Sequence, residues 1–168
     1  LNIKQNFNNK QCNFSIGNVP DSWDWRKHNV VNPIKNQEQC GSCWAFSAVA
    51  SIESVNAIKH KKLESLSEQQ LLDCSGDYGN QGCEGGLMDQ AFSYVIDNGL
   101  CSEKGYPYNA TDEPCQNCTE IVKIKSFCDI PKNNEELLMK YVFTQPVSIA
   151  VEADSMDFQM YKRGVFNY

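Results

Sequence analysis

The chain has 168 residues and a formal net charge of −6, with 41% hydrophobic and 21% charged residues. These proportions are typical of one large or two small globular domains with a substantial core, and not of a disordered chain. No apolar run approaches the roughly 18 residues of a membrane-spanning helix, and the acidic balance argues against nucleic acid as a partner, because phosphate binding needs clustered Lys and Arg.

The first helix is predicted to begin at Cys43. Residues 1–18 are polar, rich in Asn and without periodicity, so we expect a tail there and ordered structure from about Val19. From Cys43 onward, apolar residues recur at helical spacing. They are Phe46, Val49, Ile52, Val55 and Ile58.

Two further helices are predicted in the middle of the chain. Ser67 and Gln70 form a capping-box pattern, in which the Ser67 hydroxyl caps the Gln70 amide and the Gln70 side chain reaches back to Ser67. A short helix should therefore start directly after Ser67. Apolar positions over residues 87–96 predict the next helix, and Asn98-Gly99 is a signal for its end.

The last third of the chain is predicted to contain a loop region, one helix and two strands. Residues 100–120 are predicted to form a loop region held by cysteines, and residues 134–143 fit one more helix that stops before Pro146. Alternating apolar residues over 147–151 predict a strand, and residues 165–166 predict another. Helices followed by strands favour an α+β fold with segregated layers.

The cysteine content indicates an oxidising compartment, because nine cysteines are many for this length. Nine is an odd number, so at least one thiol is free, metal-bound or paired outside the chain. Three Asn-x-Ser/Thr sites fit a secreted protein. They lie at Asn13, Asn109 and Asn117.

One segment concentrates the candidate chemistry. It reads Gln37-Glu38-Gln39-Cys40-Gly41-Ser42-Cys43-Trp44-Ala45-Phe46. Cys43 lies where the helical pattern starts, and there unpaired backbone N–H groups and the helix dipole favour a thiolate. The thiolate is the form in which cysteine acts as a nucleophile.

The same cysteines allow two other interpretations. Cys40 and Cys43 form a Cys-x-x-Cys pattern, as in thiol–disulfide oxidoreductases, and Cys115 and Cys118 form a second one that could complete a zinc site. However, 71 residues separate the two pairs, far more than in a zinc ribbon, and no βαβ pattern precedes the first pair. Both interpretations are therefore disfavoured, and no metal site is predicted.

The segment around Cys43 resembles the nucleophile signature of papain and the cathepsins, Cys-Gly-[Ser/Ala]-Cys-[Trp/Tyr]. Other motifs extend the resemblance from about Val19 to the end of the chain. They are Leu66-Ser67-Glu68-Gln69-Gln70-Leu71-Leu72-Asp73-Cys74, Gly82-Cys83-Glu84-Gly85-Gly86 and Tyr106-Pro107-Tyr108. The chain is thus similar to the cathepsin L-like branch of the papain-like cysteine proteases.

This resemblance implies a papain-like two-domain fold of the α+β class. The helical left domain is expected over residues 19–130, with an N-terminal arm at residues 19–27. Residues 131–168 are expected to be the first part of an antiparallel β-barrel right domain, which would be incomplete. Residues 1–18 are expected to be the end of an inhibitory propeptide.

The resemblance also assigns roles around the nucleophile. It implies that the Gln37 side-chain amide and the Cys43 backbone N–H bind the oxyanion formed when the thiolate attacks a peptide carbonyl. It further implies that Gly85 and Gly86 hold the substrate in an extended conformation, where glycines permit close approach. A surface-loop role for Gln37 and a plain turn at the glycines are the alternatives.

Three apolar residues are expected to line the pocket for the second substrate residue before the cut, P2. They are Leu87, Met88 and Ala150. An apolar pocket favours Leu, Phe or Val at P2. Leu87 and Met88 would otherwise be ordinary core residues.

Two disulfides are implied by the resemblance, Cys40–Cys83 and Cys74–Cys115. Four other cysteines remain, and they are Cys12, Cys101, Cys118 and Cys128. A third bridge between Cys101 and Cys118, which flank one loop, would match some protozoan relatives. Cys12 and Cys128 have no assigned partner, and Cys12 lies in the expected propeptide.

The catalytic histidine is expected beyond Tyr168. The family's His and Asn follow the nucleophile by roughly 130–150 residues, and 125 residues follow Cys43 here. The two histidines present, His28 and His60, match neither position. We therefore expect this chain alone to be an inactive part of a longer enzyme.

The favoured function is a cysteine endopeptidase that acts through a thiolate acyl-enzyme on peptide or protein substrates, without a cofactor. Expected partners are an inhibitory propeptide and cystatin-type inhibitors. The expected location is the lysosome, another acidic vesicle or the secreted space.

The alternative function is that of a non-catalytic relative that binds peptides or partners in its cleft. A His and a later Asn-Ser-Trp-like segment beyond Tyr168 would distinguish the two.

Overall fold

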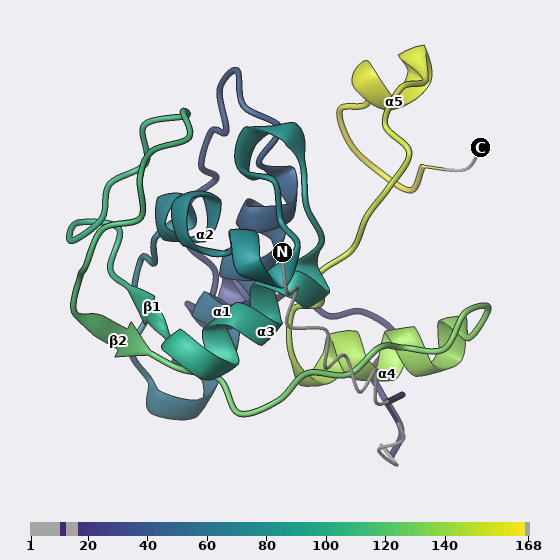
Figure 1. The fold of residues 1–168 in the computed structure, drawn as a ribbon. Coiled ribbons are helices and arrows are strands. Elements are labelled where there is room, and N and C mark those ends of the chain that lie inside the picture. The colour runs from purple at the N-terminus through teal and green to yellow at the C-terminus, as the bar shows by residue number, and fades with distance from the viewer. Residues whose placement is uncertain (1–10, 13–16, 167–168) are drawn as a thin grey trace.

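The structure is a computed structural model that describes residues 11–12 and 17–166. Helix α1 (Cys43–His60) packs against α2 (Glu68–Cys74) and α3 (Met88–Asn98) to form the helical body. Figure 1 shows this body on one side of the molecule, with α4 (Glu135–Thr144) and α5 (Met156–Gln159) standing away from it. Most of the packed core therefore belongs to the part of the chain before residue 123.

Helix α1 is the centre of the core. Buried residues lie on every side of it rather than along one stripe, as in a helix enclosed by its neighbours. Ala45 and Ala48 are fully buried, so their small side chains allow α2 and α3 to approach closely. The core also contains Trp44, Val49, Ile52, Leu66, Leu71, Leu72, Ala91, Tyr94, Val95 and Leu100. The predicted start of this helix at Cys43 is confirmed.

Half of the predicted capping box is present at α2. The Ser67 hydroxyl accepts a hydrogen bond from the Gln70 N–H at 3.0 Å, as predicted. The return bond is wrong, because the Gln70 side chain accepts the Cys101 N–H instead and the Ser67 N–H donates to the Cys101 carbonyl. The start of α2 is thus tied to a neighbouring strand rather than only to itself.

That strand belongs to a two-stranded sheet in the region predicted to be a loop. Strand β1 (Leu100–Cys101) pairs antiparallel with β2 (Glu120–Val122). Strands of two and three residues are too short to show an alternating pattern, so no periodic signal indicates them. Three short 3-10 turns likewise lack a sequence signal. They are η1 (Trp25–His28), η2 (Gly76–Tyr78) and η3 (Gly82–Glu84).

The predicted helices over residues 87–96 and 134–143 are confirmed as α3 and α4. Gly99 follows α3 with a φ of 76° and donates its N–H to Val95, as the end signal indicated. The Asn134 side chain caps α4 by accepting the Leu137 N–H at 3.0 Å. Local capping therefore sets the C-terminal end of α3 and the N-terminal end of α4.

The predicted strands over residues 147–151 and 165–166 are wrong for the described part of the chain. Residues 147–151 form no strand, and α5 follows them. Ile149 and Val151 are more than half exposed. Alternation marks residues suited to a strand, but a strand forms only when another strand pairs with it.

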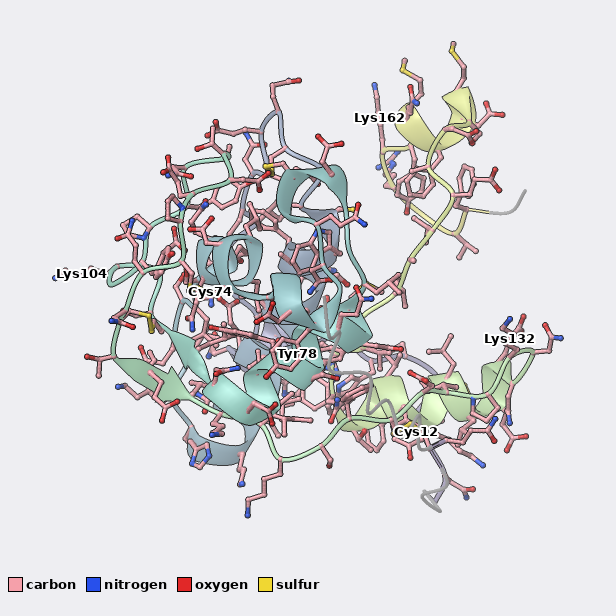
Figure 2. The ribbon with its side chains drawn as sticks, in the orientation of Figure 1. Cys12, Cys74, Tyr78, Lys104, Lys132 and Lys162 are labelled. Carbon is pink, nitrogen blue, oxygen red and sulfur yellow. A yellow bond between two sulfur atoms is a disulfide. The ribbon has the colours of Figure 1, made fainter. Side chains whose placement is uncertain are left out.

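Within residues 11–12 and 17–166, no helix combines the length and apolar character needed to cross a bilayer. Lys104, Lys132 and Lys162 project from three separate parts of the molecule (Figure 2).

A buried charge cluster joins α1 and α2 to the segment before the nucleophile. The Lys35 ammonium donates to Glu53 at 2.9 Å, to Glu68 at 2.7 Å and to the Leu66 carbonyl at 3.1 Å. Burial alone would lower the pKa of Lys35, but the two carboxylates together raise it. Burial raises the pKa of Glu68 to about 7, because one ammonium shared with Glu53 does not offset its desolvation. The Glu68 Oε2 atom is buried without a partner among the described residues.

This cluster predicts that acid stabilises the fold. Between pH 4.5 and about 7, folded Glu68 keeps a proton that the unfolded chain has lost, so its contribution is complete below pH 4.5 and is lost as pH rises through about 7. The loss should be on the order of 2–3 kcal/mol. Glu68→Gln should flatten the pH dependence of the thermal midpoint over this range, whereas Glu135→Gln, at the exposed start of α4, should not. An unchanged slope in Glu68→Gln would contradict the assignment.

Candidate active site

Cys43 carries the candidate nucleophile. It is the first residue of α1 and is exposed, and among the nine cysteines, all of which lie in the described residues, it alone is unpaired. The first N–H groups of a helix have no intrahelical partner, and the positive end of the dipole lies there. The thiol is therefore presented where an anion is favoured.

The residue before the nucleophile does not cap the helix. Ser42 occupies the N-cap position and is fully buried, but its side chain makes no capping bond. Its hydroxyl lies 2.7 Å from the Tyr108 hydroxyl, which in turn lies 2.7 Å from the Gln37 carbonyl. Ser42 and Gln37 are thus connected through one tyrosine.

Gln37 lies in a tight turn beside the first turn of α1, and residues 36–41 are named the Gln37 turn. The Gln37 side-chain amide donates to the Cys40 carbonyl at 2.8 Å. A primary amide has two N–H donors, so one remains available for a ligand. Glu38 adopts a left-handed conformation with a φ of 54°, and its N–H donates to the Asn36 side chain at 3.0 Å. These bonds hold the Gln37 amide close to the helix start.

A disulfide and a glycine lock the Gln37 turn to the glycine loop of residues 82–86. Cys40 is bonded to Cys83, and the Gly41 N–H donates to the Cys83 carbonyl at 2.9 Å. A Cβ on Gly41 would lie only 2.4 Å from that carbonyl oxygen, so the close approach requires glycine. The Gln37 turn and the glycine loop therefore move as one unit.

The two glycines at the end of that loop have different structural roles. Gly85 has a φ of 122°, which only glycine adopts readily, and its N–H and C=O are both used within the loop. A Cβ on Gly86 would lie 2.4 Å from the Asn80 side chain and 2.7 Å from the Trp44 ring. The backbone groups of Gly86 make no hydrogen bond within the described chain. Gly86, rather than Gly85, is thus free to pair with an extended peptide.

Trp44 and Asn80 hold the glycine loop and the residue that follows it in place. The Trp44 indole N–H donates to the Gly82 carbonyl at 3.2 Å, and its ring fills the space beside Gly86. The Asn80 side chain accepts the Leu87 N–H at 2.9 Å. Gly86 therefore lies against the residue that follows Cys43 in the first turn of α1.

The two histidines lie elsewhere. His60 is the last residue of α1, about 25 Å along the helix from Cys43 at 1.5 Å per residue. The His28 ring stacks on Trp23 at 4.4 Å and meets Trp25 edge-on. Among the described residues, no hydrogen bond or ring contact joins either histidine to Cys43.

Comparison with known proteins decides the family. The papain family cysteine proteases match residues 19–168 of the chain. The chain belongs to this family. A low-temperature-induced cysteine proteinase of Solanum lycopersicum is 53% identical over 152 residues, which are 88% of this chain and 44% of that protein. The senescence-specific cysteine protease SAG39 of Oryza sativa subsp. indica is 51% identical over 155 residues, 91% of this chain and 46% of that protein.

The chain thus spans about half the length of the curated relatives it matches. A solved structure, the Carica candamarcensis cysteine protease CMS1MS2 in complex with E-64, is similar with a TM-score of 0.84 and 42% identity. The match covers 88% of this chain and 70% of that chain. The predicted papain-like fold is therefore confirmed.

Within this papain-family chain, the expected P2 residues are not gathered into one closed pocket. Leu87 and Ala150 are exposed, while Met88 is half-buried and lines a cavity of about 930 Å³. That cavity runs along the second half of α1, and Cys43 is not among its lining residues. The Ser148 hydroxyl donates to the Ser47 carbonyl at 2.7 Å, which places the segment before Ala150 against α1.

The disulfide pairing argues against the redox and zinc interpretations of the cysteines. The structure contains Cys40–Cys83 and Cys74–Cys115, the pairs that the family resemblance implies, together with Cys101–Cys118 and Cys12–Cys128. Cys40 is therefore not bridged to Cys43, as a redox motif requires. Cys115 and Cys118 have separate partners. In the part of the chain that the structure describes, no group of three His, Cys, Asp or Glu side chains is placed to hold a metal ion.

Sequence reasoning missed three residues that shape the site, Ser42, Asn80 and Tyr108. Tyr108 had a signal, because it closes a family motif, but the motif does not say where its hydroxyl lies. Ser42 is a residue type preferred at helix N-caps, so the sequence does not indicate that its hydroxyl bonds to Tyr108 instead. Asn80 lies in an irregular loop, where no periodic pattern indicates a contact.

Proposed function

We propose that the complete protein is a cysteine endopeptidase and that this chain carries its nucleophile half. The supporting observation is the isolation of Cys43: four disulfides take up the other eight cysteines, while Cys43 is exposed at the start of α1 beside the Gln37 amide. An oxidised protein that keeps one exposed thiol at a helix N-terminus is suited to nucleophilic catalysis.

The proposed reaction follows from this arrangement. The Cys43 thiolate attacks a peptide carbonyl carbon, and the oxygen that gains negative charge accepts hydrogen bonds from the Cys43 N–H and the Gln37 amide. Collapse of this intermediate breaks the C–N bond, and the leaving amine takes a proton from a general acid. A water molecule then hydrolyses the thioester and restores the thiol. The general acid is a histidine that we expect beyond residue 168.

Substrate binding is proposed to use the glycine loop. An extended peptide would pair with the free backbone groups of Gly86, and its P2 side chain would lie near Leu87, Met88 and Ala150. These apolar neighbours favour Leu, Phe or Val at P2. The similar Carica candamarcensis protease was solved in complex with E-64, which supports a ligand-binding site on this fold. Peptide substrates, the propeptide and cystatin-type inhibitors are proposed to occupy the same cleft.

A non-catalytic peptide-binding relative is the second candidate. A binding module would need the cleft and Gly86 but not an exposed thiol. The Gln37 amide, the free Cys43 thiol and the open first turn of α1 would then serve no purpose. We therefore favour the enzyme.

The decisive test replaces the nucleophile in the full-length protein. Cys43→Ala and Cys43→Ser should both abolish turnover of a peptide with Leu or Phe at P2, because the other eight cysteines of the described residues are held in disulfides and cannot attack. An epoxide thiol inhibitor should label Cys43 alone, as mass spectrometry of the digested protein can show. Undiminished turnover in either variant would sink the proposal.

Removal of the oxyanion donor should slow the chemical step. Gln37→Ala is expected to lower kcat by roughly 10²–10³, the usual effect of losing one such donor. Gln39→Ala, an exposed neighbour in the same turn, serves as the matched control and should leave kcat unchanged. A loss of less than threefold for Gln37→Ala would show that this amide does not bind the oxyanion.

Residues 19–168 alone should show no protease activity. The thiolate lacks an imidazolium partner, and helix-dipole stabilisation of roughly 0.3–1 kcal/mol at exposed sites cannot replace one. Turnover should be measured after removal of aggregates and beside the full-length enzyme. Activity above about 1% that Cys43→Ala abolishes would mean that His28 or His60 acts as the base.

We propose that the protein passes through the secretory pathway to an acidic vesicle or the extracellular space. Its four disulfides require an oxidising compartment for folding. Exposed Asn109 is the best-placed glycosylation site, because Thr111 donates both its N–H and its hydroxyl to the Asn109 side-chain oxygen at 3.2 Å. The site at Asn117 has its middle residue, Cys118, in a disulfide, and Asn13 lies outside the described residues.

Glycosylation at Asn109 provides the test of this route. Protein from a secretory host should release a glycan from Asn109 with peptide N-glycosidase in ¹⁸O-water, which leaves labelled Asp at that position. Asn109→Gln should remove one glycan by mass, whereas Asn117→Gln should not. An unmodified Asn109 in secreted protein would contradict the assignment.

A further inference from the structure

Tyr108 connects the two segments that form the proposed oxyanion site. Its hydroxyl lies 2.7 Å from the Gln37 carbonyl and 2.7 Å from the Ser42 hydroxyl. A carbonyl oxygen can only accept, so the Tyr108 O–H donates to Gln37. The Ser42 hydroxyl then donates to the Tyr108 oxygen. The result is a directed chain of hydrogen bonds from the residue before the nucleophile to the residue expected to bind the oxyanion.

The position of the Tyr108 hydroxyl is fixed by contacts at the ring and the backbone. The ring meets Phe46 of α1 edge to face, with centroids 4.9 Å apart and an interplanar angle of 82°. The Tyr108 N–H donates to the Glu103 carboxylate at 2.9 Å. Because the ring rests on the first turn of α1, its hydroxyl is a rigid reference point for that turn.

The bond to Ser42 affects how the helix starts. Serine at an N-cap normally accepts an N–H of the first turn. Here the Ser42 hydroxyl is committed to Tyr108 and makes no capping bond. The first-turn N–H groups, including that of Cys43, are therefore not covered by the Ser42 side chain.

The bond to Gln37 affects the turn that carries the amide. The accepting carbonyl precedes Glu38, which is held in a left-handed conformation. Fixing this carbonyl fixes the peptide plane between Gln37 and Glu38, and with it the direction in which the Gln37 side chain leaves the backbone. Oxyanion binding depends on donors that are already in position before the reaction.

We propose that Tyr108 is a positioning residue that sets the distance between the Gln37 amide and the Cys43 N–H. The proposal rests on the proposed peptidase function. The hydrogen bonds and ring contact of Tyr108 within the described chain do not include Cys43, so it acts through Gln37 and Ser42. Its effect belongs to stabilisation of the transition state and not to substrate binding.

The test is a double-mutant cycle in the full-length enzyme. Tyr108→Phe keeps the ring against Phe46 and removes only the hydroxyl. It should lower kcat by roughly fivefold to tenfold, the effect of one hydrogen bond, with KM within about twofold. In a Gln37→Ala background the same change should cost less than about twofold, because the group being positioned is gone. All rates are normalised to thiol titrated by the epoxide inhibitor, which removes effects of unfolded protein.

Tyr106→Phe is the matched control from the same motif. The Tyr106 hydroxyl donates to Asp73 at 2.8 Å and contacts no described residue of the Gln37 turn, so this variant should keep its kcat per titrated thiol. An unchanged kcat in Tyr108→Phe would overturn the proposal, as would a loss that multiplies in full with that of Gln37→Ala. A Gln37→Ala single variant with normal kcat would instead refute the oxyanion assignment of the proposed function.

A second inference rests on a different observation, the bridge between Cys12 and Cys128. Cys12 is 6% exposed, and its N–H donates to the Asp129 carbonyl at 2.9 Å. Cys12 therefore lies beside the loop that leads to α4 (Figure 2). Cys12, which lies in the expected propeptide, is thus covalently attached to the rest of the chain.

The other described cysteines offer Cys128 no replacement partner. Six of them are paired with one another in three disulfides, and Cys43 is the candidate nucleophile. Among the described residues, loss of Cys12 would therefore leave the exposed Cys128 without a partner. We infer that cleavage before Val19 leaves the Cys12 peptide bonded to the processed enzyme. This inference rests on the expectation that residues 1–18 are the end of a propeptide, and not on catalysis.

Peptide mapping of enzyme processed in an oxidising host tests the inference. Non-reduced enzyme should yield two N-termini, one at Val19 and one before Cys12, together with a linked Cys12–Cys128 peptide. Dithiothreitol should release the N-terminal piece, and in a Cys12→Ser, Cys128→Ser variant it should be lost without reductant. Alkylation of Cys128 before reduction, or a chain left uncut between Cys12 and Val19, would overturn the inference.

Discussion

The buried ring of Trp44 is the contact on which the rest of the site depends. It follows the nucleophile directly and is 2% exposed, so the first turn of α1 is anchored in the core while Cys43 stays at the surface. The indole N–H holds the Gly82 carbonyl, and the ring occupies the space beside Gly86. One side chain therefore determines both where the thiol is presented and how closely the glycine loop approaches it.

The remaining parts of the site are fixed to this anchor by bonds that bypass the helix. The Cys40–Cys83 disulfide joins the Gln37 turn to the glycine loop. Tyr108 joins the same turn to Ser42. Each of these segments is therefore held by bonds from two directions. Such preorganisation is what the proposed oxyanion donors would require, because they must be in place before charge develops.

The parts of the fold that are predictable from the sequence are those whose cause is local. The start of α1 follows from periodicity, whereas the end of α3 and the start of α4 each depend on one capping residue, and the structure contains all three. The failures have non-local causes. Gln70 bonds to β1 rather than to its own helix end, and the alternating residues 147–151 have no described strand beside them. No pattern within a segment reveals which distant partner competes for its hydrogen bonds.

The same distinction applies to the site. The Cys43 segment is recognisable by residue type and spacing, so the sequence alone suffices to name the candidate nucleophile and the Gln37 amide. It does not suffice to separate the tasks of Gly85 and Gly86, because they differ only in their backbone, where Gly85 uses its own N–H and C=O. The role of the Tyr108 hydroxyl likewise depends on its hydrogen bonds to Ser42 and Gln37, which are 66 and 71 residues away in the sequence.

The two disulfides that involve residues 101–118 determine what a single proteolytic cut in this stretch would do. This stretch is irregular and largely exposed, which makes it the kind of loop that a concentrated endopeptidase would cut in its own copies. Cys101–Cys118 closes the stretch at its ends, and Cys74–Cys115 pins it to α2. A single break between the bridges would release no fragment, and both cut ends would stay close to their original contacts. A single cut in this stretch would therefore leave every residue that supports the candidate site attached to the chain.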